Sequence, residues 1–179
     1  MNPTVIGFSG RIASGKSAIS AALAADIGCR RVSFGDYVRK VAAERGLAPT
    51  REALQSLGEE LEAADVNRFC RAVVDWAEWR LGSSLVVDGI RHVQVLESLR
   101  SLVKPTPLIL VFVEAGDSRR TSRLAERGEG EDARLGLVES HSTERDVLEG
   151  LPQLADIRLS ADDSTGSAVA TLRAELELL

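Results

Sequence analysis

The chain has 179 residues, of which 44% are hydrophobic, and a formal net charge of −5 at pH 7. This length fits a single domain, residues 1–179, and we expect no second domain of full size. The negative charge argues against a broad nucleic-acid surface, and no apolar run approaches the roughly 20 residues that span a bilayer. The first residues also lack the basic region of a signal peptide, so we expect a cytoplasmic protein with neither nucleic-acid nor membrane partners.

Apolar runs alternate along the chain with segments of helical periodicity. The runs that we expect to be strands are 5–8, 31–33, 85–87, 108–113 and 157–159. The segments that we expect to be helices are 17–27, 36–45, 51–61, 65–81, 93–102, 117–126, roughly 143–148, and 166–178. This alternation predicts a three-layer α/β fold, in which crossover helices connect the strands of a five-stranded parallel sheet.

The first strand leads into the sequence Gly-Arg-Ile-Ala-Ser-Gly-Lys-Ser at residues 10–17, which fits the pattern G-x-x-x-x-G-K-[ST]. Between a strand and a helix this pattern predicts a P-loop, whose backbone N–H groups and helix N-terminus bind phosphate. The residues that we expect to bind the donor nucleotide are Gly10, Ala13, Ser14, Gly15, Lys16, Ser17 and Ala18. Lys16 would reach the β and γ oxygens of ATP, and the Ser17 hydroxyl would bind Mg²⁺.

A wholly helical stretch, about residues 36–82, separates the second and third predicted strands. It breaks at residues 46–49, where Thr50 is a plausible cap for the next helix. We expect this insertion to close over a second substrate. At its start, Asp36 is expected to cap a helix, and Arg39 either faces an acceptor phosphate or lies on the surface.

Asp88, Gly89, Ile90 and Arg91 follow the third predicted strand. Ligands of open α/β sheets bind at the carboxyl ends of the strands, where an acidic residue can orient Mg²⁺. Asp88 is therefore a candidate metal residue together with Ser17, and Arg91 is a candidate for the crevice beside the P-loop. The alternative is that Asp88 caps a turn and Arg91 is solvated.

Arg120, Arg123 and Arg127 recur at spacings of three and four residues on one predicted helix face. The face would point toward a glycine-rich, charged stretch, which we take as a candidate lid over residues 127–145, with Arg145 at its end. A solvated helix face and an ordinary exposed loop are the alternatives. The acidic residues of this stretch would repel a triphosphate unless they face outward or pair with arginine.

These motifs, in this order, resemble the nucleoside monophosphate kinase branch of P-loop proteins. Residues 33–39 are similar to the acceptor-binding segment of adenylate kinases, and residues 88–91 resemble their aspartate-glycine-x-proline-arginine element without the proline. The closest likeness is to small archaeal nucleotide kinases related to dephospho-CoA kinase, and it extends over nearly the full length. Residues 51–58 also resemble a segment of deoxynucleoside monophosphate kinases.

The resemblance implies an enzyme that transfers the γ-phosphoryl group of Mg-ATP to a small nucleotide. It implies catalytic roles for five residues and an acceptor site built from three. The catalytic set is Lys16, Asp88, Arg91, Arg123 and Arg127. The acceptor set is Asp36, Arg39 and Arg91, with Arg145 as a lid residue.

Other functions remain open at this stage. A hydroxyl acceptor, as in dephospho-CoA kinase, would benefit from a nearby carboxylate, for which Asp36 and Asp88 are the candidates. A nucleotide-binding regulator without transfer activity is a further alternative. A GTPase switch is disfavoured, because the chain has no Asn-Lys-x-Asp segment.

Overall fold

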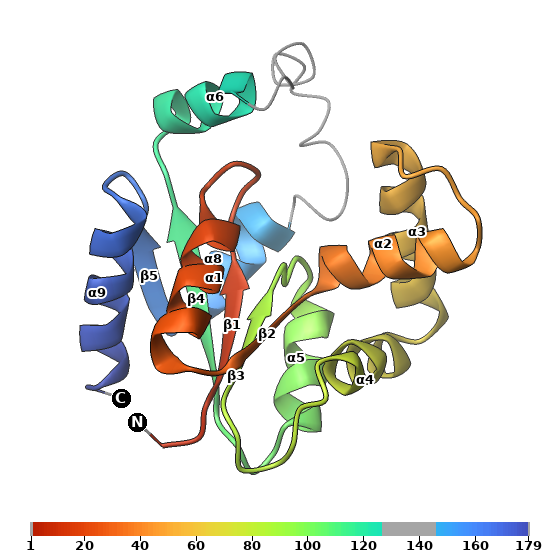
Figure 1. The fold of residues 1–179 in the computed structure, drawn as a ribbon, viewed down its shortest axis with the longest axis horizontal. Coiled ribbons are helices and arrows are strands. Elements are labelled where there is room, and N and C mark those ends of the chain that lie inside the picture. Colours follow the sequence, from red (N-terminus) through yellow and green to blue (C-terminus); the bar gives the residue numbers. More distant parts are fainter. Residues whose placement is uncertain (1, 127–145, 179) are drawn as a thin grey trace.

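The sheet of this computed structural model, which describes residues 2–126 and 146–178, has five parallel strands. They are β1 (Val5–Ser9), β2 (Arg30–Ser33), β3 (Leu85–Asp88), β4 (Leu108–Glu114) and β5 (Ile157–Ser160). The strand order is β2-β3-β1-β4-β5, so the P-loop follows the central strand (Figure 1). The predicted three-layer fold with five parallel strands is therefore confirmed.

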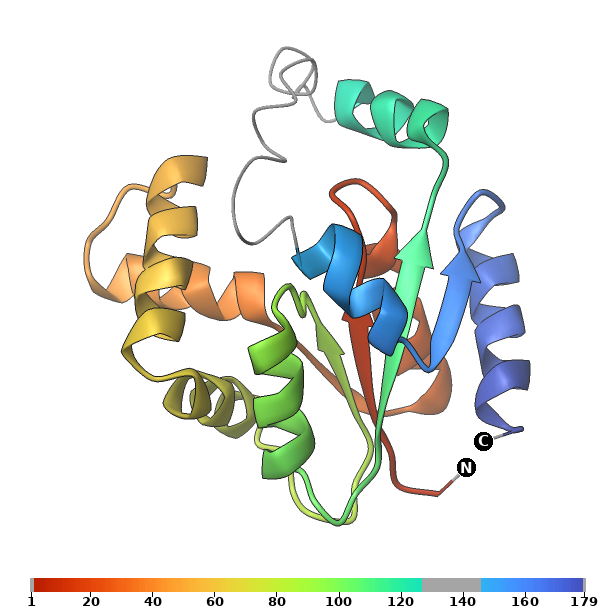
Figure 2. The same cartoon turned by 180° about the vertical axis from the view of Figure 1, so that it is seen from behind.

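Helices cover both faces of the sheet. Helices α1 (Lys16–Ile27) and α9 (Thr165–Leu176) lie on one face (Figure 1), and α5 (Val93–Leu102) and α8 (Leu151–Leu154) lie on the other (Figure 2). Helix α6 (Asp117–Glu126) lies beyond the carboxyl ends of the strands, above the loop that follows β1. No helix within the described ranges is long and apolar enough to span a bilayer.

The hydrophobic core consists of two clusters, one on each face of the sheet. One contains Val86 and Val111 from the strands and Ile19 and Leu23 from α1. The other joins the strands to the helices between β2 and β3, as well as to α5 and α8. Since strands buried on both faces read as continuous apolar runs, the sequence signal for β1, β3 and β4 was strong.

Three helices connect β2 to β3: α2 (Phe34–Glu44), α3 (Arg51–Ala64) and α4 (Val66–Trp76). They extend to one side of the sheet (Figure 1). The predicted cap Thr50 is confirmed, because its side chain accepts a hydrogen bond from the Ala53 N–H at 3.2 Å. The predicted cap Asp36 is wrong: Ser33 caps α2 by accepting from the Asp36 N–H at 3.3 Å, and Asp36 lies in the first turn.

Two predicted helices differ from those in the structure. The helix expected over 65–81 is α4, which ends at Trp76, because Ala77 caps it and Glu78 adopts a φ of 51° that no helix continues. The segment expected as a helix at 143–148 is described only from residue 146. There a π-helical turn, Asp146–Gly150, leads directly into α8, which the sequence analysis did not predict.

Candidate active site

The loop between β1 and α1 has a backbone that few other sequences could adopt. Ala13 and Gly15 have positive φ angles of 60° and 94°. Gly10 has a φ of 147°, and a Cβ atom there would lie 2.4 Å from the carbonyl oxygen of Val113. Such a contact is far inside van der Waals distance and involves rigid backbone, so the site requires glycine. Lys16 then begins α1 and is buried, whereas Ser17 and Ala18 are exposed.

Arginines of α6 hold this loop from above. The Arg123 guanidinium donates through Nη1 to the carbonyl oxygens of Ala13, at 3.2 Å, and Ser14, at 2.8 Å. Arg120 donates through Nε to the Ile12 carbonyl oxygen at 3.0 Å. Arg120 and Arg123 thus contact the P-loop, whereas the candidate lid, toward which we expected this helix face to point, lies outside the described residues. Guanidinium groups satisfy the carbonyl oxygens of residues 12–14, and the Ser14 N–H donates to the Arg11 carbonyl oxygen at 3.1 Å. These contacts hold the loop in one conformation.

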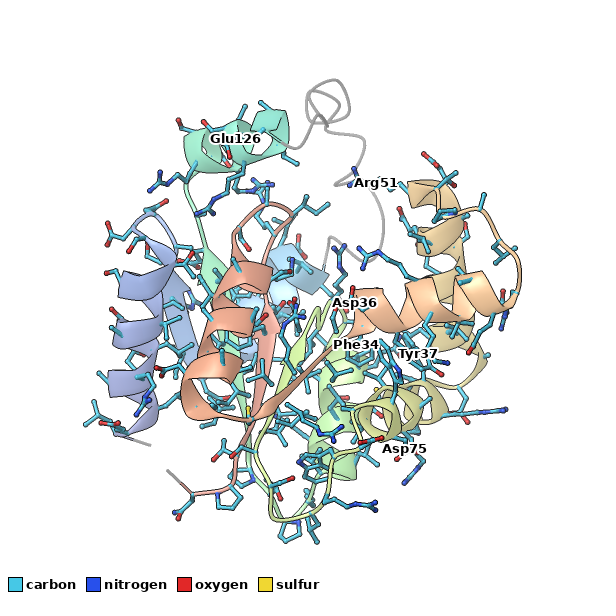
Figure 3. All side chains as sticks on the ribbon, viewed as in Figure 1. Phe34, Asp36, Tyr37, Arg51, Asp75 and Glu126 are labelled. Atoms are coloured by element: carbon cyan, nitrogen blue, oxygen red, sulfur yellow. The ribbon has the colours of Figure 1, made fainter. Side chains whose placement is uncertain are left out.

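A pocket of about 200 Å³ lies between α1, α6 and the segment that joins β5 to α9. Gly15, Arg123, Glu126, Ala161 and Asp163 are among the residues that line it. Figure 3 shows Glu126 at the end of α6. The pocket adjoins the P-loop, so it has the position required for the remainder of a nucleotide whose phosphates the loop binds.

Asp88, at the carboxyl end of β3, is only 2% exposed. Its Oδ2 lies 2.5 Å from Nη2 of Arg31, a residue of β2 that the sequence analysis did not consider as a site residue. Its Oδ1 has no hydrogen-bond partner within the part of the chain that the structure describes. An unpartnered buried carboxylate oxygen and the exposed Ser17 hydroxyl are the hard donors that Mg²⁺ prefers, so these residues fit the metal that the P-loop implies.

The residues predicted for the acceptor lie at the start of the insertion and after β3. Asp36 and Arg39 are one helical turn apart and form an ion pair, with 2.6 Å between Oδ1 and Nη1. In Figure 3 the Asp36 side chain lies at the start of α2, where the insertion leaves the sheet. The register pairs Ser33 with Asp88 and Phe8 with Asp88, so strands β2, β3 and β1 end side by side. Arg91 is partly buried in the turn after Asp88.

The turn that carries Arg91 is fastened to the central strand. The backbone N–H groups of Gly89 and Ile90 both donate to the Phe8 carbonyl oxygen, at 3.2 Å and 3.0 Å. Gly89 has a φ of 89°, a conformation that favours glycine. The Ile90 side chain is fully buried, and its Cδ1 fills the space over Gly7, where a Cβ would lie only 2.6 Å away. The Asp-Gly-Ile-Arg segment is thus rigidly held against β1.

A second polar cluster, absent from the sequence analysis, links the insertion to α5. His92 Nε2 lies 3.3 Å from Oε2 of Glu62 at the end of α3, and His92 Nδ1 lies 3.6 Å from Oδ2 of Asp146. Asp146 also accepts from the Val93 N–H at 3.0 Å. Burial raises the pKa of the Glu62 carboxyl above its usual value, and the charge of His92 opposes this. No nearby sequence signal could have indicated a cluster built from three separate segments.

Two residues predicted to screen transferred charge, Arg127 and Arg145, lie outside the described residues, as does the whole candidate lid 127–145. The described ranges contain no group of three or more His, Cys, Asp or Glu side chains that could hold a metal ion by themselves. Within these ranges, Ser17 and Asp88 would therefore hold Mg²⁺ together with nucleotide phosphates.

The fold and the loop together define the class: this is a P-loop protein with the fold of small kinases. The structure has a TM-score of 0.65 to TT1252 from Thermus thermophilus, at 17% identity over 100% of this chain and 99% of that one. It has a TM-score of 0.56 to a gluconokinase from Sinorhizobium meliloti, at 18% identity over 98% and 92%. It has a TM-score of 0.57 to the shikimate kinase of Aquifex aeolicus, at 14% identity over 97% of this chain and 96% of that one. At these identities the likeness concerns the fold.

The family follows from the sequence. Residues 6–145 match the AAA_18 model, which describes an AAA domain. The chain is 34% identical over 149 residues to a UPF0200 protein of Methanothrix thermoacetophila, covering 81% of this chain and 78% of the relative. The chain therefore belongs to the AAA_18 domain family and is a member of the UPF0200 proteins. The name UPF0200 does not itself specify an activity.

Proposed function

We propose that this protein is an ATP-dependent phosphotransferase whose acceptor is a nucleoside or deoxynucleoside monophosphate. One observation supports this most directly: the P-loop, the buried carboxylate Asp88 and the first turn of the helical insertion meet at the carboxyl edge of three adjacent strands. This arrangement brings a donor phosphate and a second substrate to one place. The resemblance of residues 33–39 and 88–91 to adenylate kinase elements supports the choice of acceptor.

The residue roles in this proposal follow from phosphoryl-transfer chemistry, in which alignment and charge neutralisation provide most of the acceleration. Lys16 and the backbone N–H groups of residues 13–17 bind the donor phosphates. Ser17 and Asp88 would hold Mg²⁺, which neutralises negative charge on the β and γ oxygens. Arg39 and Arg91 bind the acceptor phosphate.

Arg123 of α6 has a structural role in this proposal besides the catalytic role expected for it. Because Arg123 donates to the P-loop carbonyl oxygens, it keeps the loop in its phosphate-binding conformation and adds positive charge at the same point. We propose that Arg127 and Arg145 contribute further charge at the candidate lid.

A hydroxyl acceptor is the second candidate. The unpartnered Oδ1 of Asp88 favours it, since such a group could accept the proton of a hydroxyl that attacks the γ-phosphorus. Dephospho-CoA, gluconate and shikimate are suitable probes, the last two because proteins of the same fold are kinases named for them.

The test is ADP production by the purified protein with Mg-ATP and a panel of ribonucleoside and deoxynucleoside monophosphates, dephospho-CoA, gluconate and shikimate. We expect one monophosphate to raise ADP turnover far above the rate with ATP alone. Lys16→Ala should lower that turnover at least about 10²-fold, because this lysine neutralises the negative charge that develops during transfer. Turnover with dephospho-CoA, gluconate or shikimate, and with no monophosphate, would favour the hydroxyl acceptor. ATP binding without turnover by any acceptor would contradict both and favour a regulatory nucleotide-binding protein.

A further inference from the structure

A buried carboxylate at the end of a strand requires a counter-charge. Asp88 is 2% exposed, and the core residues Val86 and Val87 precede it in the same strand. An ionised carboxylate in such surroundings is costly unless it is paired and hydrogen-bonded. The residue that supplies the pair also decides which carboxylate oxygen remains for a ligand.

Arg31 is that residue. It pairs with Val86 in the sheet register, and Asp88 is two residues further along β3, so alternation places both side chains on the α1 face. Its Nη2 lies 2.5 Å from Oδ2 of Asp88, and its own side chain is 24% exposed. Oδ1, the other oxygen, is the one without a hydrogen-bond partner within residues 2–126 and 146–178.

The guanidinium is itself held in place by the P-loop helix. Nε of Arg31 donates to the Ser20 hydroxyl at 2.9 Å, and that hydroxyl donates to the Ser17 carbonyl oxygen at 3.0 Å. Arg31 therefore donates both to Asp88 and, through the Ser20 hydroxyl, toward the Ser17 carbonyl oxygen, and these hydrogen bonds connect the start of α1 to the end of β3. The planar fork of arginine suits this double attachment, which the single ammonium group of lysine cannot reproduce.

The same guanidinium extends toward the insertion. Nη1 of Arg31 lies 3.7 Å from Oδ2 of Asp36, whose other oxygen binds Arg39. Arg31 therefore lies at the junction of the P-loop helix, the end of β3 and the first turn of α2. A purely structural pair at the edge of a sheet would not need partners on three elements of the site.

We propose that Arg31 is a positioning residue of the phosphoryl-transfer site: it fixes Oδ2 of Asp88 so that Oδ1 is the atom offered to Mg²⁺ or to one of its water ligands. This inference rests on the proposed function, because it requires a nucleotide phosphate and Mg²⁺ at the P-loop. Partners that orient a metal-binding group typically change metal affinity by about 10- to 100-fold when they are removed.

The test measures binding of ADP to the whole chain by calorimetric titration, once with Mg²⁺ and once with EDTA. We expect Mg²⁺ to tighten ADP binding in the natural sequence, and Arg31→Gln to reduce that tightening by about 10-fold while changing the EDTA value less than about twofold. Asp88→Asn should cause a similar loss, and the double variant should add little to it, because both residues act on the same oxygen.

The chain offers a matched control in Arg30, the neighbouring residue of β2. Its side chain is 61% exposed, and its Nη1 lies 2.6 Å from Oε2 of Glu78. Arg30→Gln should therefore leave the tightening of ADP binding by Mg²⁺ unchanged. Ser20→Ala and Arg31→Lys weaken the same attachment with a smaller change in charge or volume. These two variants should lose part of the tightening of ADP binding by Mg²⁺, and they replace Arg31→Gln in the test if that variant does not fold.

The possible outcomes are separable. If Arg31→Gln weakens ADP binding equally with Mg²⁺ and with EDTA, or not at all, Arg31 does not position Asp88 for the metal and the inference is overturned. If the natural sequence binds ADP neither with Mg²⁺ nor with EDTA, the proposed function fails. The inference about Arg31 then fails because no nucleotide binds, not because Arg31 does not act on Asp88.

Discussion

Gly10 shows at the scale of one residue how the P-loop conformation is fixed. A Cβ atom there would lie 2.4 Å from the Val113 carbonyl oxygen, and β4 cannot move away without losing its pairing to β1. We expect Gly10→Ala to lower the free energy of unfolding by more than about 2 kcal/mol and to abolish ADP binding. Urea unfolding and calorimetric titration provide the two measurements.

Gly28 provides the control for this substitution. Its φ of 67° also disfavours other residues, but nothing lies within 4 Å of a Cβ added there. Gly28→Ala should therefore cost only about 1 kcal/mol and leave ADP binding unchanged. Equal losses in the two variants would mean that the contact with Val113 is unimportant.

The two cysteines differ in a way that solution chemistry can detect. Cys70 is fully buried, and burial raises the pKa of its thiol from 9.0 to about 11. Cys29 is partly exposed, and its thiol pKa is also raised by burial. At pH 8 we expect a thiol reagent to modify Cys29 slowly and to reach Cys70 only after unfolding, because the reactive thiolate is scarce and inaccessible there.

Cys29→Ala is the check on this prediction. The native variant should show no reacting thiol at pH 8 and one in denaturant. The raised pKa also implies that Cys70 contributes stability that is present below pH 9 and is lost as the pH rises from 9 toward 11. Rapid native modification of Cys29→Ala would show that the core around Cys70 opens.

At the scale of elements, Glu62 connects α3 to α5. Its Oε1 accepts from Gln94 Nε2 at 2.9 Å, and its Oε2 faces His92. Since burial raises the pKa of the Glu62 carboxyl above 4.5, the folded state binds its proton more tightly than the unfolded state does. The stability that this carboxyl provides is therefore present below pH 4.5 and is lost as the pH rises through the folded-state pKa.

Glu62→Gln removes this ionisation and keeps a group of similar shape. We expect the unfolding free energy of the natural sequence, relative to Glu62→Gln, to fall between pH 4 and pH 7, as measured by urea unfolding at each pH. Glu60→Gln is the control on the same helix, because Glu60 is exposed and pairs with Arg45, with 2.8 Å between Oε1 and Nη1. A pH dependence shared by both variants would assign the effect to other groups.

At the scale of the whole molecule, the insertion and the sheet share one core. Val38, Leu57 and Phe69 of the insertion belong to the same buried cluster as Leu85 and Val87 of β3. In Figure 3, Phe34 and Tyr37 lie between α2 and α4, where their rings contact Phe69 at centroid distances of 5.2 and 6.1 Å. We therefore expect the insertion and the sheet to unfold together in one cooperative transition.

The two tryptophans make this expectation measurable. Trp76 and Trp79 are the only tryptophans of the chain; Trp76 is the last residue of α4 and Trp79 lies three residues beyond it. Tryptophan fluorescence therefore reports this end of the insertion, while far-UV circular dichroism reports all helices. The two signals should give the same urea midpoint. A fluorescence transition at clearly lower urea would mean that the insertion unfolds by itself.

The strands and the P-loop could be predicted because their signals are local: buried runs, a glycine pattern and a helix start that adjoin in sequence. The Arg31 to Asp88 pair could not, since it joins residues 57 positions apart through the register of β2 on β3. The direction of Arg120 and Arg123 depended on where α6 lies above the sheet, which periodicity does not fix. The early end of α4 depended on the backbone of Glu78.

The path of the insertion has a consequence for how such proteins diversify. The chain leaves the sheet after Ser33 and returns at Leu85, on two strands that pair directly. Everything between these points can be exchanged without changing the path of β1, α1, β4 or β5. In the proposed kinase, the segment expected to contact the acceptor could therefore vary while the P-loop and its strands stay the same. The condition on any replacement is an apolar surface that seals Val5, Leu85 and Val87 from water.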